Sequence, residues 1–193
     1  QDGSGFIYVD PDTNQLQTVE DLQKVGNANP DFNLGFRNNL SWKGFNLGFL
    51  LTARIGGEVM SATQAILDKY GVSEASAIAR DNGGVTVNFG KLDPQYFYEY
   101  IGGGDTGMLS NYVYSATNVR LQELTLGYNL PKKWFNDKLN MTVSLIGRNL
   151  WMIYNKAPFD PESIAFTGTY FQGLDYFMQP SLRNVGFSVR MQF

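Results

Sequence analysis

Residues 32–55 read FNLGFRNNLSWKGFNLGFLLTARI, and large apolar side chains alternate with polar or small ones along most of this stretch. Successive side chains of a β-strand point to opposite faces of the sheet, so the alternation predicts strands with one apolar and one polar face. Lys43 and Gly44 interrupt the pattern, and a two-residue connection is typical of a tight hairpin. The stretch therefore predicts two antiparallel strands, near residues 31–42 and 45–56.

Three further stretches alternate in the same way, near residues 117–130, 139–152 and 183–193. In the first of them, Val119 and Leu121 fall on the other parity from the apolar residues nearer its C-terminal end. A β-bulge reverses parity in this way, so we expect either a bulge in this strand or a rise of its first residues out of the membrane. A strand of about 11 residues tilted by about 40° spans roughly 25–30 Å, the height of the apolar band of a membrane barrel.

The connections between the expected strands are alternately short and long. The first has two residues and the third about eight, whereas the second and fourth have about 60 and about 30. Membrane barrels alternate short periplasmic turns with long extracellular loops in this manner. The prediction is an all-β fold of about five antiparallel C-terminal strands from a large transmembrane β-barrel. Apolar residues at helical spacing predict a helix over Glu58–Tyr70 in the longest loop, and a second helical turn is expected over Ser73–Arg80.

Composition excludes several classes of function. The 15 basic and 18 acidic residues leave a formal charge of −3, so no basic stripe is available for nucleic acid. The sequence has no Cys and no His, which removes disulfides, thiolate or imidazole metal sites and triads built on His. It shows no nucleophile–base pair, so we do not expect an enzyme. A soluble β-sandwich that binds glycan and a passive porin stay open as alternatives, although the long second connection opposes the regular short turns of a sandwich.

Six motifs occur along the chain. They are Gly26-Asn27-Ala28-Asn29-Pro30-Asp31-Phe32, Trp42-Lys43-Gly44-Phe45, Ala116-Thr117-Asn118-Val119-Arg120-Leu121-Gln122-Glu123-Leu124, Leu126-Gly127-Tyr128-Asn129-Leu130-Pro131, Gly147-Arg148-Asn149-Leu150 and Ala157-Pro158-Phe159-Asp160-Pro161-Glu162. In this order they resemble the C-terminal end of SusC/RagA-type TonB-dependent transporters of Bacteroidetes, over residues 8–193. Residues 1–193 are therefore interpreted as the C-terminal segment of such a barrel.

The resemblance implies a barrel of about 22 strands with a plugged lumen, in the outer membrane. It implies that the plug, and the segment that contacts TonB, lie outside this chain. The expected partners are the remainder of the barrel and plug, outer-membrane lipid, and a SusD-like surface lipoprotein over the extracellular mouth. The implied function is TonB-dependent uptake of glycans or peptides, and finding a plug domain in the same gene would separate this transporter from a porin.

Four arginines fall on the polar parity of the expected strands: Arg37, Arg54, Arg148 and Arg190. In a barrel this parity faces the lumen, where the arginines could contact the plug or influence selectivity. The alternative is that they only solvate the wall and pair with plug carboxylates.

A candidate calcium loop lies near the N-terminal end. Asp10, Asp12 and Asn14 stand at its first, third and fifth positions, and Asp21 stands at its twelfth. Gln15 occupies the position that an EF-hand loop reserves for Gly, so a solvated acidic turn is the alternative. No other cofactor is expected.

The last expected strand ends in alternating apolar residues, Phe187, Val189, Met191 and Phe193. This ending resembles the C-terminal signal by which outer-membrane barrels are recognised for assembly. The alternative is an ordinary edge strand that happens to end in Phe.

The first and last expected strands each have a neighbour on one side only within this chain. Lipid does not tolerate open sheet edges, and in water such edges promote aggregation. We therefore expect residues 1–193 produced alone to precipitate or to require detergent, which size-exclusion chromatography after refolding would test. A soluble monomer that unfolds cooperatively would favour the β-sandwich instead.

Overall fold

The structure is a computed structural model that describes residues 7–17, 23–103, 108–136, 138–165, 168 and 171–192. The chain divides into two compact units, each formed by three separate segments. The first unit comprises Gln1–Gly26, Val59–Tyr114 and Ala165–Phe177, and the second comprises Asn27–Glu58, Ser115–Ile164 and Met178–Phe193.

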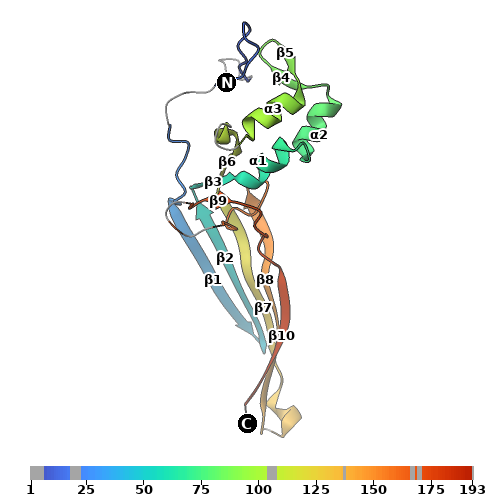
Figure 1. Cartoon of the computed structure of the whole chain (residues 1–193). Helices are drawn as coiled ribbons and strands as arrows, with labels where there is room; N and C mark the ends of the chain where they lie inside the picture. Colours follow the sequence, from blue (N-terminus) through green and yellow to red (C-terminus); the bar gives the residue numbers. More distant parts are fainter. Residues whose placement is uncertain are drawn as a thin grey trace. The chain divides into compact units, whose positions relative to one another are not determined.

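The second unit is built on five antiparallel strands that lie side by side in one sheet (Figure 1). They are β1 (Phe32–Trp42), β2 (Phe45–Ile55), β7 (Asn118–Asn129), β8 (Asn140–Asn155) and β10 (Asn184–Gln192), in the spatial order β1-β2-β7-β8-β10. All five coincide with expected strands, although β8 continues three residues beyond its expected end. The 3₁₀ turn Lys132–Phe135 lies in the short connection between β7 and β8.

Lys43 and Gly44 form the hairpin between β1 and β2, as the sequence predicts. Both have positive φ, at 45° and 91°, which is the requirement of a type I′ turn. A Cβ on Gly44 would also lie 3.3 Å from the Asn129 carbonyl oxygen and 3.3 Å from the Tyr128 ring. This position therefore needs glycine both for its backbone conformation and for the close approach of β7.

The strand register gives the sheet one apolar and one polar face. The apolar face carries Phe36, Leu47, Phe49, Leu126, Val143 and Val189, with Leu47 opposite Leu126 and Val143 opposite Val189. The polar face carries Arg37, Asn39, Asn46, Thr125, Thr142, Ser144 and Ser188.

The expected bulge in β7 is confirmed. Leu50 of β2 lies opposite Glu123 and the next residue, Leu51, lies opposite Leu121, so Gln122 is the extra residue. The shift brings Val119 and Leu121 onto the apolar face despite their opposite parity in the sequence.

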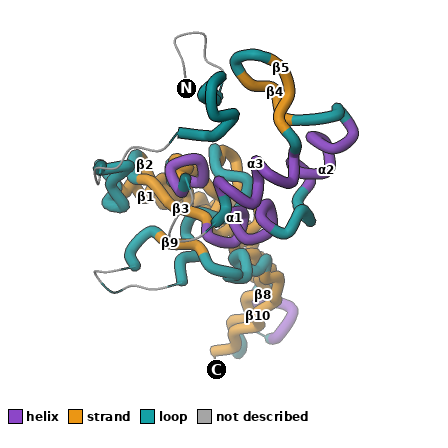
Figure 2. Tube along the Cα trace, turned by 45° about the horizontal axis from the view of Figure 1, so that its top comes forward, coloured by secondary structure: helices purple, strands orange, loops and turns teal. Residues whose placement is uncertain are grey.

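The first unit has a small core of its own. Its helices are α1 (Ala62–Lys69), α2 (Glu74–Asp81) and α3 (Pro94–Ile101), and α3 packs against both α1 and α2 (Figure 2). Its strands are β3 (Glu58–Ser61), β6 (Val113–Ser115) and β9 (Leu174–Asp175), in the order β6-β3-β9, and the hairpin β4 (Val85–Val87) with β5 (Gly90–Leu92). The 3₁₀ turn Leu109–Tyr112 precedes β6. The buried core includes Leu16, Ala65, Leu92, Phe97 and Ile101.

The helix expected over Glu58–Tyr70 is shorter than predicted. Residues 58–61 form β3, and α1 begins after Ser61, whose hydroxyl accepts a hydrogen bond from the Gln64 amide at 3.1 Å. The second helical turn, expected over Ser73–Arg80, is α2. Within the described ranges, no helix combines the length and the apolar character needed to cross a membrane.

The two faces of β7 can be tested with a pair of neighbouring substitutions. Leu126→Lys places a charge on the apolar face, and in lipid this should cost about 2–4 kcal/mol near mid-bilayer. Thr125→Lys changes the polar face of the same strand and should be tolerated. Outer-membrane levels and thermal denaturation of the full-length protein would compare them, and equal effects would contradict a lipid-facing apolar side.

Candidate functional site

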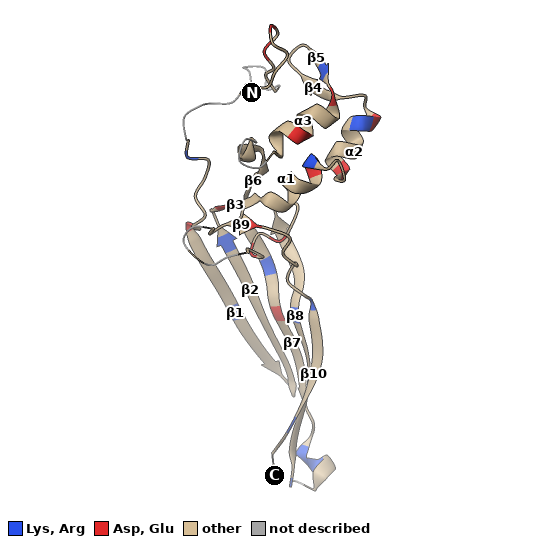
Figure 3. Ribbon diagram, viewed as in Figure 1, with Lys and Arg blue, Asp and Glu red and all other residues tan. Residues whose placement is uncertain are grey.

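The charged residues of the five-stranded sheet all lie on its polar face. They are Arg37, Arg54, Arg120, Glu123, Arg148 and Arg190. Figure 3 shows how few charges these strands carry compared with the loops. The polar face is therefore the face of this sheet that can interact with ionic or polar ligands.

Glu123 of β7 lies between Arg148 of the adjacent strand β8 and Arg37 of β1, which is two strands away on the other side. Its carboxylate is 3.8 Å from Nη2 of Arg37 and 3.7 Å from Nε of Arg148. The two arginine side chains are 57% and 65% exposed, so each ion pair contributes at most about 1 kcal/mol. These distances exceed a hydrogen bond, which leaves the guanidinium donors available to other groups.

A shallow groove of about 270 Å³ runs over this part of the polar face. Its walls include Arg37 and Glu123 together with hydroxyl and amide side chains from four strands. The polar ones are Asn39, Ser41, Asn46, Thr125, Thr142 and Ser144. Such a lining offers both hydrogen-bond donors and acceptors.

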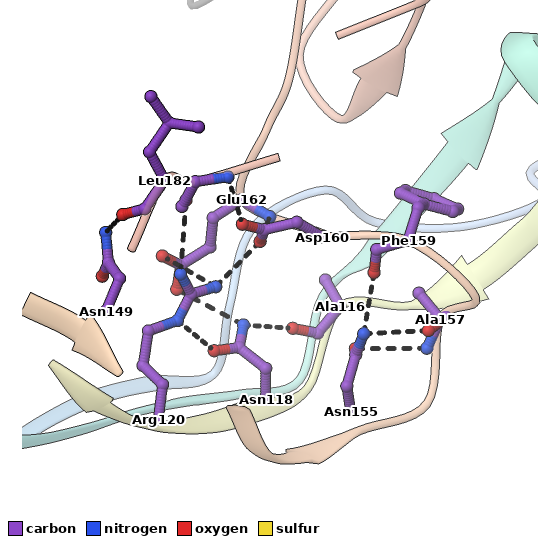
Figure 4. A network of polar contacts seen from close by, with 11 residues as sticks. Ala116, Asn118, Arg120, Asn149, Asn155, Ala157, Phe159, Asp160, Glu162 and Leu182 are labelled. Atoms are coloured by element: carbon purple, nitrogen blue, oxygen red, sulfur yellow. Dashed lines mark hydrogen bonds and ion pairs between the residues drawn. The ribbon is translucent and has the colours of Figure 1, made fainter. Parts of the chain in front are cut away.

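A second polar cluster surrounds Arg120 near the start of β7 (Figure 4). Nη2 of Arg120 is 2.8 Å from Oδ1 of Asp160 and 3.3 Å from Oε2 of Glu162. The side chains of Arg120 and Asp160 are only 5% and 7% exposed. Nε of Arg120 also donates to Oδ1 of Asn118 at 3.3 Å, so the buried charge has both an ionic partner and a hydrogen-bond acceptor on its own strand.

Asp160 joins the two ends of the loop between β8 and β10. Its Oδ1 accepts a hydrogen bond from the Glu162 amide and its Oδ2 accepts one from the Ser181 amide, both at 3.1 Å. Burial raises the pKa of Asp160, but hydrogen bonds from Arg120 and Ser181 and from the Glu162 amide outweigh it and lower the pKa to about 2. Because the folded pKa lies below the unfolded value of 3.8, the ionised carboxylate stabilises the fold above about pH 4. That stabilisation is lost as the pH falls through 2.

The four predicted arginines occupy different surroundings on the polar face. Arg37 and Arg148 share Glu123, and Arg190 lies on β10 opposite Thr142. Nη2 of Arg54 donates to the Ala28 carbonyl at 2.7 Å, which ties the segment before β1 to β2. Their location in a lumen stays a prediction.

The candidate calcium loop lies in the first unit. Oδ1 of Asp10 accepts a hydrogen bond from the Asp12 amide at 2.9 Å, and Asn14 has a positive φ of 55°. The hydrogen bond from Asp12 lowers the pKa of Asp10. Asp21 lies outside the described residues, so the calcium site stays a prediction, and the described part has the geometry of an acidic turn.

The expected assembly signal falls on the last strand. Phe187, Val189 and Met191 lie on the apolar face of β10, and Phe193 is outside the described residues. Its role in assembly stays a prediction.

Sequence reasoning did not identify Glu123, Arg120 and Asp160 as a group. Glu123 could have been found, because it is the one acidic residue in the five strands. Arg120 and Asp160 are 40 residues apart, and nothing local in the sequence indicates that they meet.

No family model matches the sequence. The chain is 28% identical over 199 residues to "TonB-dependent receptor P3" of Formosa agariphila, an alignment that covers 100% of this chain and 19% of that receptor. It is 26% identical over 198 residues to "TonB-dependent receptor P26" of the same organism, covering 98% of this chain and 20% of the relative. The chain thus spans about one fifth of the length of these relatives.

Solved structures of the RagAB peptide importer have the same fold. The "closed-closed" state matches with a TM-score of 0.60 and 18% identity, over 96% of this chain and 20% of that chain. The "open-open" state matches with a TM-score of 0.59 and 20% identity over the same shares. The five antiparallel strands therefore correspond to part of the β-barrel wall of that importer.

The Arg120–Asp160 pair can be tested by removing one charge. Asp160→Asn leaves a buried guanidinium with only the partly exposed Glu162 carboxylate, and we expect a loss of about 2–5 kcal/mol. Glu162→Gln, at a position whose side chain is 39% exposed, is the matched control and should cost less. Thermal denaturation of the full-length protein would measure both, and equal stability of the two variants would contradict the central role of Asp160.

Proposed function

Since this chain belongs to the TonB-dependent receptors of the SusC/RagA type, we propose that it forms wall strands and surface loops of an outer-membrane nutrient importer. The observation that carries this proposal is the separation of the sheet into one face without any charge and one face with every charge. A barrel wall between lipid and a water-filled lumen requires this separation.

The apolar face needs a covering that the described part of the chain does not supply. Trp42 is 68% exposed, Val185 71% and Phe187 80%. Apolar patches of this kind on a protein surface are contact sites. Lipid is the covering we propose, because the patch extends along all five strands rather than forming one compact spot.

The remaining parts of the importer follow from the sheet order and from the relatives. Strands β1 and β10 are the edges of the sheet, and each would pair with a further strand of the same barrel. The plug and the segment that contacts TonB would belong to other parts of the protein. The named RagAB importer supports a SusD-like lipoprotein as partner, and the transported nutrient would be a glycan or a peptide.

The alternatives account for fewer observations. A soluble β-sandwich requires a second sheet packed over the apolar face, whereas Trp42, Val185 and Phe187 of this face are largely exposed. A passive porin has the same two-faced wall, but the relatives are TonB-dependent receptors rather than porins. An active importer is therefore the better interpretation.

Topology can be tested with two introduced cysteines, since the chain has none of its own. Ser110 is exposed in the long connection before β7, and Lys133 is exposed in the short connection after it. In intact cells, an impermeant maleimide should label Ser110→Cys, because long loops face the outside. Lys133→Cys should react only after the outer membrane is permeabilised, and the opposite result would reverse the orientation.

A further inference from the structure

The polar face of the sheet carries a charge opposite in sign to that of the whole chain. It has five arginines and one glutamate, whereas the chain as a whole has a formal charge of −3. The surplus cannot be cancelled from the other side of the sheet, because the apolar face holds no charged residue.

The five arginines are not equally available. Arg120 is buried against Asp160 and Glu162, so its charge is already compensated. Arg37 and Arg148 share one glutamate through long contacts and remain more than half exposed. Arg190 is exposed, and no acidic side chain of the described residues lies within ion-pair distance of it or of Arg54.

We propose that the polar face attracts and binds anionic groups, and that it favours nutrients bearing carboxylate, sulfate or phosphate. The proposal rests on the function proposed above, because it requires that this face line a water-filled lumen. It goes beyond that function by giving the chemical class of the solute that this wall favours.

The geometry suits this chemistry. Guanidinium groups bind planar or tetrahedral oxyanions through parallel hydrogen bonds, and they stay charged at any relevant pH. The groove beside Arg37 is also lined by Asn39, Thr125 and Ser144, whose amide and hydroxyl groups can donate further hydrogen bonds. A positive surface on a low-dielectric wall also focuses its field into the water beside it, which raises the local concentration of anions.

The competing arrangement is neutralisation by the plug. Carboxylates of a plug domain could lie against Arg37 and Arg148 and cancel their charge. The two arrangements differ in the electrostatic potential beside the polar face of the assembled receptor, and a charged thiol reagent measures that potential directly.

The experiment uses the full-length receptor in detergent with one cysteine at Asn33 or Asn39, two exposed positions on the polar face of β1. Each variant reacts with an anionic sulfonatoethyl and a cationic trimethylammonioethyl methanethiosulfonate of similar size. The measured quantity is the rate of reaction with the anionic reagent divided by the rate with the cationic reagent. It is normalised by the same ratio measured for a small neutral thiol in solution. A positive potential also lowers the pKa of the cysteine thiol. This changes the rates with both reagents by the same factor, so it cancels in their ratio.

We expect a normalised ratio of roughly five or more at low salt, from a potential of order one or more kT. About 1 M salt should bring it close to one, because the screening length is then about 3 Å. Arg37→Gln with Arg148→Gln should lower the ratio at Asn39→Cys. Glu123→Gln, the matched change of opposite sign, should raise it.

A ratio of one or less in both parent cysteine variants would overturn the proposal, since acidic groups elsewhere would then compensate the arginines. That result would leave the importer function intact. If neither cysteine reacts with either reagent in folded receptor, the polar face does not line water, and both the proposal and the proposed function are wrong.

Discussion

A shift of one residue in the pairing of β2 with β7 would carry the arginines of a strand to the apolar face. Side chains alternate along a strand, so register decides which residues meet lipid and which meet water. The bulge at Gln122 preserves this separation within β7, because Arg120 and Glu123 would otherwise lie on opposite faces. Both polar clusters of the unit, around Glu123 and around Arg120, therefore depend on one extra residue in one strand.

The features that the sequence predicts well are local. The strands from Phe32 to Ile55 are visible because alternation repeats within a few residues and the turn between them needs Gly44. The bulge is visible for the same reason, since Val119 and Leu121 change parity within a single strand. The separation of polar and apolar faces then follows from parity alone.

The features that the sequence does not predict depend on distant contacts. Residues 58–61 have apolar spacing that suits a helix, yet Met60 pairs with Leu174 and the segment becomes β3. The Asp93 carboxylate caps the amide of Tyr96, and Pro94 begins α3. These two signals are local, so α3 is an exception to this rule. The Arg120–Asp160 pair had no local signal at all, because its partners are brought together by the loop after β8.

The distribution of the basic residues supports a specific role for the wall arginines. The five strands of the sheet contain arginine and no lysine, whereas Lys43, Lys132, Lys133 and Lys138 all lie in the two short connections. An ammonium is strongly hydrated and suits a turn surrounded by water, while a guanidinium is more weakly hydrated and presents a planar set of donors. If the charges served only to keep the polar face hydrated, lysine would serve as well as arginine. The exclusive use of arginine on the polar face, with one glutamate among five, is better explained by contact with oxyanions than by solvation.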